Sequence, residues 1–307
     1  MRIALVSSLV SPIRDAAANG PHSIVVDLAR GLGSRGHAVA IYAARGSAAD
    51  GVEIREVDVD PDVRRATFRP GHPAPATALA ALERGFERVF ELVAQDGADV
   101  VSQHAFDAPA ITLSERLPAL HTLHLPPIAD DVVAAARRTQ RPIASVSHAA
   151  SASWRDAIAC DVLTLRNGVP SPPDRLLSAR PIADLALIAG RISPEKGTDV
   201  AIRVARRAGM RPLVVGDVYD EGYFEARVRP LLRESEFVGA VRRAQLAQLM
   251  VESAVLLMPI RWDEPFGLVA AEAQMVGCPV AGYRRGALPE VVQDGVGGAL
   301  VPADDED

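Results

Sequence analysis

The sequence predicts an α/β fold with two domains, each a parallel β-sheet covered by helices. Short apolar runs alternate with amphipathic helical segments, which is the pattern of βαβ units with right-handed crossovers. The chain has 307 residues, which exceeds one ordinary core and favours two domains. The proline-rich segment PSPPD (170–174) is the best linker candidate, because the strand–helix pattern restarts after it.

In the first half, the elements follow the hydrophobic pattern. A buried strand at 2–6 leads to a loop with Asn19-Gly20-Pro21, and a helix from His22 ends at Gly33 and Gly36. We then expect strands at 38–43, within 52–59 and at 99–102, 120–123, 142–146 and 162–165, and a helix at 77–93. Several of these strands end in polar residues. In open α/β sheets, ligands bind outside the carboxyl ends of the strands.

The second half repeats the alternation. Expected strands lie at 185–189, 212–216, 236–239, 254–258, 279–281 and 299–301, and expected helical segments at 199–208, 224–233, 244–251, 264–272 and 288–293.

Composition narrows the function classes. The hydrophobic share of 49% and charged share of 23% are those of a soluble globular protein. A net charge of −6 argues against a general nucleic-acid binder. No apolar run approaches the ~20 residues that span a bilayer, and we identify no signal peptide. Two cysteines, Cys160 and Cys278, are too few for a disulfide framework or a cysteine metal site and indicate a cytoplasmic protein.

The loop GRISPEKG (190–197) suits a diphosphate. Arg191 offers a planar guanidinium and Lys196 a point charge, while Gly190 and Gly197 allow close approach of the backbone. Lys196 is the only lysine among the 33 basic residues. The loop lacks the P-loop pattern. A basic turn paired with nearby acids explains these residues equally well.

The segment EPFGLVAAE (264–272) predicts a helix N-terminus between two carboxylates, Glu264 and Glu272. Such an N-terminus suits a phosphate. If the whole segment is helical, ~1.5 Å per residue separates the carboxylates by roughly 12 Å, too far for the ~5–5.5 Å pair of a retaining glycosidase. A sugar nucleotide fits this spacing, and a surface helix with two glutamates is the alternative.

These motifs resemble the retaining family-4 glycosyltransferases of the GT-B fold (glycosyl transferases group 1), in particular their short bacterial members. GRISPEKG, EFVGAV and the run from MPIRWDEPFGLVAAE to GGALV resemble the donor domain, with the E-x7-E motif as the most specific match. MRIALVSS, LARGLGSRGHAVAIYA and LRNGV resemble the first domain. The resemblance implies two Rossmann-like domains that face a central cleft, with an acceptor-side domain at 1–170, a hinge at 171–182 and a donor domain at 183–307.

The resemblance also implies roles for individual residues. Arg191 and Lys196 hold the donor diphosphate, Glu264 contacts hydroxyls of the donor sugar, and Glu272 binds the ribose. The resemblance places Gly190 and the backbone of Phe266, Gly267 and Leu268 in contact with the donor. Val238 and Val241 are expected around its base. The loop at Gly20 is expected to face the donor, and His124 to lie near the reacting centre.

The sequence departs from the family in two places. The glycine pair of the first loop is here Asn19-Gly20, and only six residues follow Val301, where the family continues with further helices. The donor domain is therefore either truncated or part of an incomplete chain.

Other polar and aromatic residues carry weaker interpretations. His104 and His148 could line the acceptor cleft or be ordinary loop residues, and we interpret Asp130-Asp131 as helix-capping carboxylates. Trp154 is expected in the core, Trp262 next to the donor motif, and His22 on the surface of the first helical turn.

The sequence thus predicts a metal-independent retaining glycosyltransferase with no cofactor beyond its sugar-nucleotide co-substrate, UDP-sugar favoured, and a hydroxyl-bearing acceptor. Peripheral membrane contact is left open. A non-catalytic sugar-nucleotide binder is one alternative. A nicotinamide-dependent oxidoreductase is another, although no G-x-G-x-x-G follows the first strand.

Overall fold

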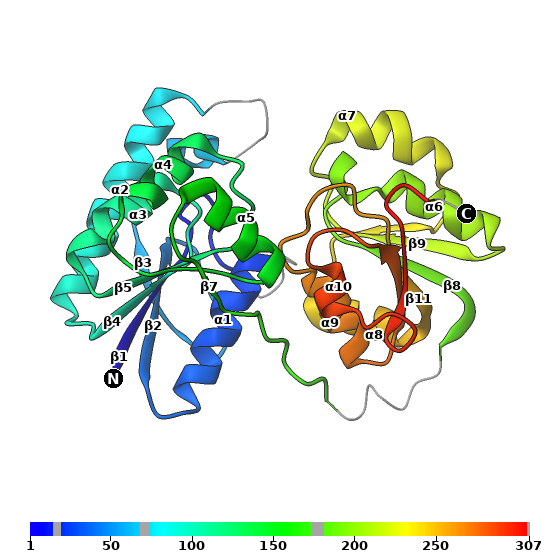
Figure 1. The fold of residues 1–307 in the computed structure, drawn as a ribbon, viewed down its shortest axis with the longest axis horizontal. Helices are drawn as coiled ribbons and strands as arrows, with labels where there is room; N and C mark the ends of the chain where they lie inside the picture. Colours follow the sequence, from blue (N-terminus) through cyan, green and yellow to red (C-terminus); the bar gives the residue numbers. More distant parts are fainter. Residues whose placement is uncertain (15–19, 68–73, 174–180, 306–307) are drawn as a thin grey trace. The chain divides into compact units, whose positions relative to one another are not determined.

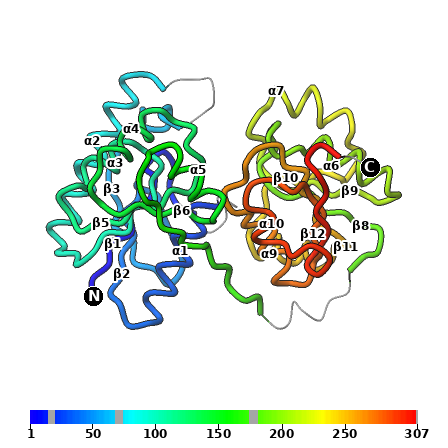
Figure 2. The backbone as a smooth tube through the Cα atoms, in the orientation of Figure 1, coloured from blue at the N-terminus to red at the C-terminus, as the bar shows by residue number. Residues whose placement is uncertain are grey.

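The computed structural model describes residues 1–14, 20–67, 74–173 and 181–305. This part of the chain forms two compact units that divide between Arg166 and Asn167. In Figures 1 and 2 the first unit runs from blue to green and the second from green to red. Residues 174–180 of the predicted hinge lie outside the described residues, and the predicted domain limits stay a prediction.

The first unit contains a seven-stranded sheet with the order β3-β2-β1-β4-β5-β6-β7, in which every neighbouring pair is parallel. Its strands are β1 (Arg2–Val6), β2 (Ala38–Ala44), β3 (Glu53–Val57), β4 (Val100–Gln103), β5 (Ala119–Leu123), β6 (Ile143–Ser145) and β7 (Leu163–Thr164). Its α-helices are α1 (Gly20–Gly33), α2 (Ala76–Gln95), α3 (Ala108–Leu113), α4 (Asp130–Arg138) and α5 (His148–Ile158), and short 3₁₀ helices lie at Pro61–Ala66 and Ser114–Arg116.

Both faces of this sheet are covered, as Figure 1 shows. Successive side chains of a strand point to opposite faces, so Ala4 and Val6 pack with α2 while Ile3 and Leu5 pack with α1. The apolar stripe of α2, which includes Phe86, is buried against the first of these faces. A strand buried on both sides must be apolar throughout, which is why β1 reads as a continuous apolar run.

The second unit contains a six-stranded sheet with the order β10-β9-β8-β11-β12-β13, also parallel throughout. Its strands are β8 (Ile182–Ala189), β9 (Arg211–Val215), β10 (Phe237–Gly239), β11 (Ser253–Met258), β12 (Val280–Tyr283) and β13 (Gly298–Val301). Its α-helices are α6 (Thr198–Arg207), α7 (Glu221–Tyr223), α8 (Arg243–Glu252), α9 (Leu268–Met275) and α10 (Leu288–Val291).

Helices also cover both faces of the second sheet. Ala186 and Ile188 of β8 pack with α6 on one face, whereas Leu185 and Leu187 of the same strand pack with α8 and α9 on the other. The strand period of two therefore divides the core of this unit into two apolar layers.

The predicted fold class is confirmed, with local differences. The sequence interpretation missed the short helix α3 and helix α5. The expected helix at 224–233 is a composite segment in which α7 continues into a π-helical stretch at Phe224–Val228 and a 3₁₀ turn at Arg229–Leu231. The segment 264–272 is helical only from Leu268, so the helical spacing of roughly 12 Å between its carboxylates does not apply. No helix in the described part is long and apolar enough to span a membrane.

Candidate functional site

The strand order of the second sheet reverses between β8 and β11. The chain leaves β8 for α6 on one face, and it leaves β11 for α9 on the other. The two outgoing loops therefore separate at the carboxyl ends of adjacent strands, which is where open α/β sheets bind ligands. These loops, at 190–197 and 259–267, carry half of the residues predicted to bind the donor.

Lys196 and Glu264 meet at this point. The Nζ atom of Lys196 donates a hydrogen bond of 2.7 Å to Oε2 of Glu264. The side chains are 20% and 11% exposed, so the ion pair is largely removed from water and stronger electrostatically than a surface pair. The backbone also joins the two loops, because the Arg261 amide donates to the Glu195 carbonyl at 2.8 Å.

Trp262 completes this group. Its indole Nε1 donates a hydrogen bond of 2.6 Å to the same Glu264 Oε2, and Lys196 Nζ lies 5.2 Å from the centroid of its ring. One carboxylate oxygen thus accepts from both neighbours, which fixes the Glu264 side chain. The sequence placed Trp262 beside the donor motif but not in contact with its carboxylate.

Glycines in the left-handed conformation precede both helices. Gly197, at φ +67°, is the N-cap of α6, and Gly267, at φ +87°, is the N-cap of α9. Neither can supply a capping side chain. The N-terminus of α9 therefore lacks a side-chain cap. The amides of Ala270 and Ala271 donate to the Gly267 carbonyl, and the amides that precede them can donate to a ligand anion.

Gly286 is a site residue that the sequence interpretation missed. A Cβ atom there would lie 2.3 Å from the Glu264 amide nitrogen. The following residue, Ala287, donates its amide to the Glu264 carbonyl at 2.8 Å. The backbone turn at Gly286 therefore packs directly against the Glu264 backbone. In the sequence, the glycine between Arg285 and Ala287 is the only feature that indicates this close contact.

Arg191 lies in the same loop as Lys196 but has different contacts. Its guanidinium lies 4.7 Å from the centroid of the Tyr219 ring and 3.6 Å from Glu195. The loop begins at Gly190, and the backbone of Gly216 approaches Gly190 so closely that a Cβ atom at Gly216 would collide with its carbonyl. The structure places Arg191 at this loop without a direct contact to Glu264.

Glu272 lies on α9 and pairs with Arg243 of α8. Arg243 Nε donates to Glu272 Oε1 at 2.8 Å, and Nη2 lies 2.7 Å from the same oxygen. Sequence reasoning missed Arg243, because no spacing relates a residue of α8 to one of α9.

The other predicted donor residues occupy different environments. Phe266 and Gly267 are buried and Leu268 is half-buried at the start of α9. Val238 is 49% exposed on the edge strand β10, whereas Val241 packs against the core beneath α8 and α9. These residues belong to the second unit, as do the two loops.

Gly20 and His124 belong to the first unit. Gly20 is the first residue of α1, and its neighbour Asn19 lies outside the described residues. His124 directly follows β5 and is buried. Its Nε2 atom lies 2.9 Å from Nδ1 of His104, the residue that directly follows β4. Burial lowers the pKa of His124 to about 4. Burial also lowers the pKa of His104 well below its usual range, with the neighbouring imidazole contributing.

Two predictions in the first unit were wrong. His22 lies in the first turn of α1, but it is buried rather than on the surface, and burial lowers its pKa to about 4. Trp154 is fully buried, as expected, and donates its indole N–H to the Leu125 carbonyl at 2.8 Å. Asp130 and Asp131 were expected to cap a helix, but they lie in the first turn of α4. Ala129 holds the N-cap position and no side chain caps the helix, so the two carboxylates favour the helix only through its dipole.

His148 is the first residue of α5 and is exposed.

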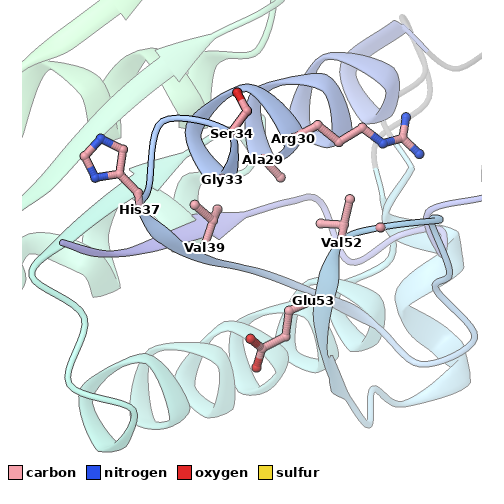
Figure 3. A pocket seen from close by; sticks show the side chains of 9 residues that line it. Ala29, Arg30, Gly33, Ser34, His37, Val39, Val52 and Glu53 are labelled. Atoms are coloured by element: carbon pink, nitrogen blue, oxygen red, sulfur yellow. The ribbon is translucent and has the colours of Figure 1, made fainter.

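A pocket of about 350 Å³ lies elsewhere in the first unit (Figure 3). It is lined by the end of α1, including Arg30 and Ser34, and by the starts of β2 and β3, including Val39 and Glu53. It therefore opens at the amino ends of these strands and contains none of the predicted site residues. No group of three or more potential metal-ligating side chains occurs among the described residues.

Residues 183–307 match the family described as "Glycosyl transferases group 1". The D-inositol 3-phosphate glycosyltransferase of Mycobacterium avium is 36% identical over 40% of this chain and 31% of its own length. The chain thus aligns with about a third of the length of the curated relatives that match it first. The enzyme of the same name from Kribbella flavida is 29% identical over 98% of this chain and 84% of its own length.

Solved structures share the fold of the whole chain. Sucrose-phosphate synthase from Thermosynechococcus elongatus has a TM-score of 0.78 at 20% identity, over 99% of this chain and 86% of its own. The Anabaena protein HepE in complex with UDP-glucose has a TM-score of 0.73 at 18% identity, over 100% and 86%. The segment 183–307 thus matches the group 1 glycosyltransferases, and the two units share the GT-B fold of the solved structures.

Proposed function

We propose that this chain is a retaining glycosyltransferase that moves a hexosyl group from a UDP-sugar to a hydroxyl-bearing acceptor without a metal ion. The convergence of Lys196 and Glu264 at the start of α9 carries this proposal. It joins a cation for phosphate, a carboxylate for sugar hydroxyls and a helix N-terminus without a side-chain cap at one point.

The ion pair is a resting arrangement in which each group neutralises the other. In the donor complex, Lys196 and the first amides of α9 bind the diphosphate, together with Arg191 from the same loop. Glu264 accepts hydrogen bonds from the sugar. Glu272, held by Arg243, binds the ribose one turn further along α9.

The main catalytic contribution is electrostatic. As the bond between the anomeric carbon and the diphosphate oxygen breaks, negative charge grows on the phosphate, where Lys196, Arg191 and the helix dipole stabilise it. The acceptor oxygen bonds to the anomeric carbon from the same face, and its proton passes to the departing phosphate oxygen. No enzymic nucleophile is required.

The uridine preference draws support from HepE, whose structures hold UDP-glucose and UDP. A thermal-shift screen of UDP-, GDP-, ADP- and dTDP-sugars and of NAD tests it, since a ligand that binds only the native state raises the melting temperature. We expect stabilisation by a UDP-sugar and sugar transfer in an acceptor panel. Binding without transfer or hydrolysis would indicate a non-catalytic binder, and stabilisation by NAD alone would contradict the proposal.

A further inference from the structure

Trp262 and Lys196 donate to the same oxygen of Glu264. The indole Nε1 atom lies 2.6 Å from Glu264 Oε2, and the Lys196 Nζ atom lies 2.7 Å from that oxygen. The other carboxylate oxygen, Oε1, accepts no hydrogen bond from any residue that the structure describes. The two oxygens of Glu264 are therefore not equivalent, because both protein donors occupy one of them.

The indole is the more rigid of these two donors. Trp262 packs against the apolar cluster formed by the second sheet with α8 and α9, and a tryptophan side chain has only two torsion angles. The Lys196 ammonium lies on a flexible four-carbon stem. The main chain of Glu264 is held as well, since the Ala287 amide donates to its carbonyl at 2.8 Å. Trp262 thus joins the Glu264 carboxylate to the packed core of the second unit.

The two donors also differ in what else they can bind. An ammonium has three N–H donors and a positive charge, whereas an indole has one N–H and no charge. Lys196 can therefore turn to a diphosphate, while the single N–H of Trp262 is already used by Glu264. The Glu264 side chain is only 11% exposed, and removal of every partner from such a carboxylate is strongly destabilising. The Trp262 hydrogen bond is the one that remains when phosphate binds the lysine.

We propose that Trp262 is a positioning residue that keeps Glu264 Oε2 occupied, so that Oε1 is the oxygen that accepts hydrogen bonds from the donor sugar. This role rests on the proposed function, in which Lys196 binds the diphosphate and Glu264 binds the sugar. Because Trp262 fixes the direction of Oε1, the carboxylate discriminates between donors by the position of a sugar hydroxyl. A donor whose hydroxyl does not reach Oε1 loses that hydrogen bond.

The indole N–H signals in a proton–nitrogen correlation NMR spectrum of the ligand-free protein test this hydrogen bond. The chain has two tryptophans, and Trp154 is the internal reference, because it donates to the Leu125 carbonyl in the first unit. Trp262→Phe assigns the other signal. Glu264→Ala should shift the Trp262 signal and speed its exchange with water, and it should leave the Trp154 signal unchanged. An unaltered Trp262 signal in a folded Glu264→Ala protein would overturn the proposal.

Calorimetric titration gives the functional measurement. Trp262→Phe removes the N–H but keeps an aromatic ring beside Lys196, whose Nζ atom lies 5.2 Å from the centroid of the Trp262 ring. The sugar probe is the one that the wild type binds most tightly among UDP-glucose, UDP-galactose and UDP-N-acetylglucosamine. Trp262→Phe should weaken binding of this probe about tenfold, the loss of about one hydrogen bond, and should change binding of UDP by less than about twofold.

The same titrations measure selectivity. The wild-type preference among the three sugar donors should narrow in Trp262→Phe, because Oε1 is no longer held in one direction. Equal changes in affinity for the sugar probe and for UDP would contradict a role at the sugar, and so would a preference retained in full. A wild-type protein that binds neither UDP nor any of the three donors counts against the proposed function, whereas the indole measurement remains a separate test of the hydrogen bond between Trp262 and Glu264.

Discussion

Lys196 Nζ lies 2.7 Å from Glu264 Oε2, although 68 positions separate them in the chain. The contact exists because each residue lies in the loop that follows one of two adjacent parallel strands, β8 and β11. Trp262 donates to the same oxygen. Two motifs that are independent in sequence thus form one polar group at the switch point of the second sheet.

Lys196→Ala should weaken UDP binding by about 1.5–3 kcal/mol, because a charge-assisted hydrogen bond to phosphate is lost. Isothermal titration calorimetry measures this change. Lys196→Arg is the matched control, since it keeps the charge and should retain part of the affinity. Unchanged UDP affinity in a folded Lys196→Ala protein would contradict the assignment of Lys196 to the diphosphate.

Glu264→Gln should reduce sugar transfer by far more than it reduces binding of UDP alone. The amide keeps the shape of the side chain but loses the negative charge that receives hydrogen bonds from sugar hydroxyls. Steady-state kinetics and UDP titration on the same preparation provide the comparison. Equal loss of transfer and UDP binding would place Glu264 at the nucleotide end of the donor instead.

Gly286→Ala should destabilise the second unit, because the new Cβ atom would lie 2.3 Å from the Glu264 amide nitrogen. Gly277→Ala is the matched control, since Gly277 also has a positive φ but has open space around its Cβ position. The control isolates backbone strain of roughly 1–2 kcal/mol. In urea denaturation, we expect Gly286→Ala to lower the free energy of unfolding by about 2 kcal/mol or more beyond the loss for Gly277→Ala. Equal losses would show that the turn at Gly286 adapts.

The stability of the first unit should fall as the pH drops from about 6.5 towards 4. Burial lowers the pKa values of His22, His121 and His124 to about 4, whereas the unfolded chain titrates near 6.5. The unfolded state therefore binds more protons in this window, and each group costs about 2 kcal/mol at pH 5.

Asp107 opposes this trend. Burial raises its pKa to about 7, so the folded state binds its proton first, and Asp107 favours folding as the pH falls. Three histidines outweigh one carboxyl, and urea denaturation at pH 7.5 and 5.0 should give a net loss. His121→Gln should reduce that loss. An unfolding free energy independent of pH would show that these histidines are not buried as neutral groups.

The local hydrophobic pattern of the sequence predicted most of the strands and helices, because most of the strands are central in their sheets and apolar on both faces. It failed where local signals were short or mixed. Helix α3 spans only Ala108–Leu113 and merges with a 3₁₀ turn. His22 looked like a surface residue because a polar side chain in a first helical turn usually faces water, and only the packing of α1 places it inside.

The sequence by itself determined the alternation of strands and helices, the two glycine-led helix starts and the residues predicted to bind the donor. These features depend on neighbours along the chain, through hydrophobic period, backbone freedom and side-chain type. The tertiary structure alone decided the partners, which are Lys196 with Glu264, Glu272 with Arg243, Gly286 with the Glu264 backbone and His104 with His124. Each partnership joins residues from different elements, and only strand order and helix packing bring them within hydrogen-bond distance.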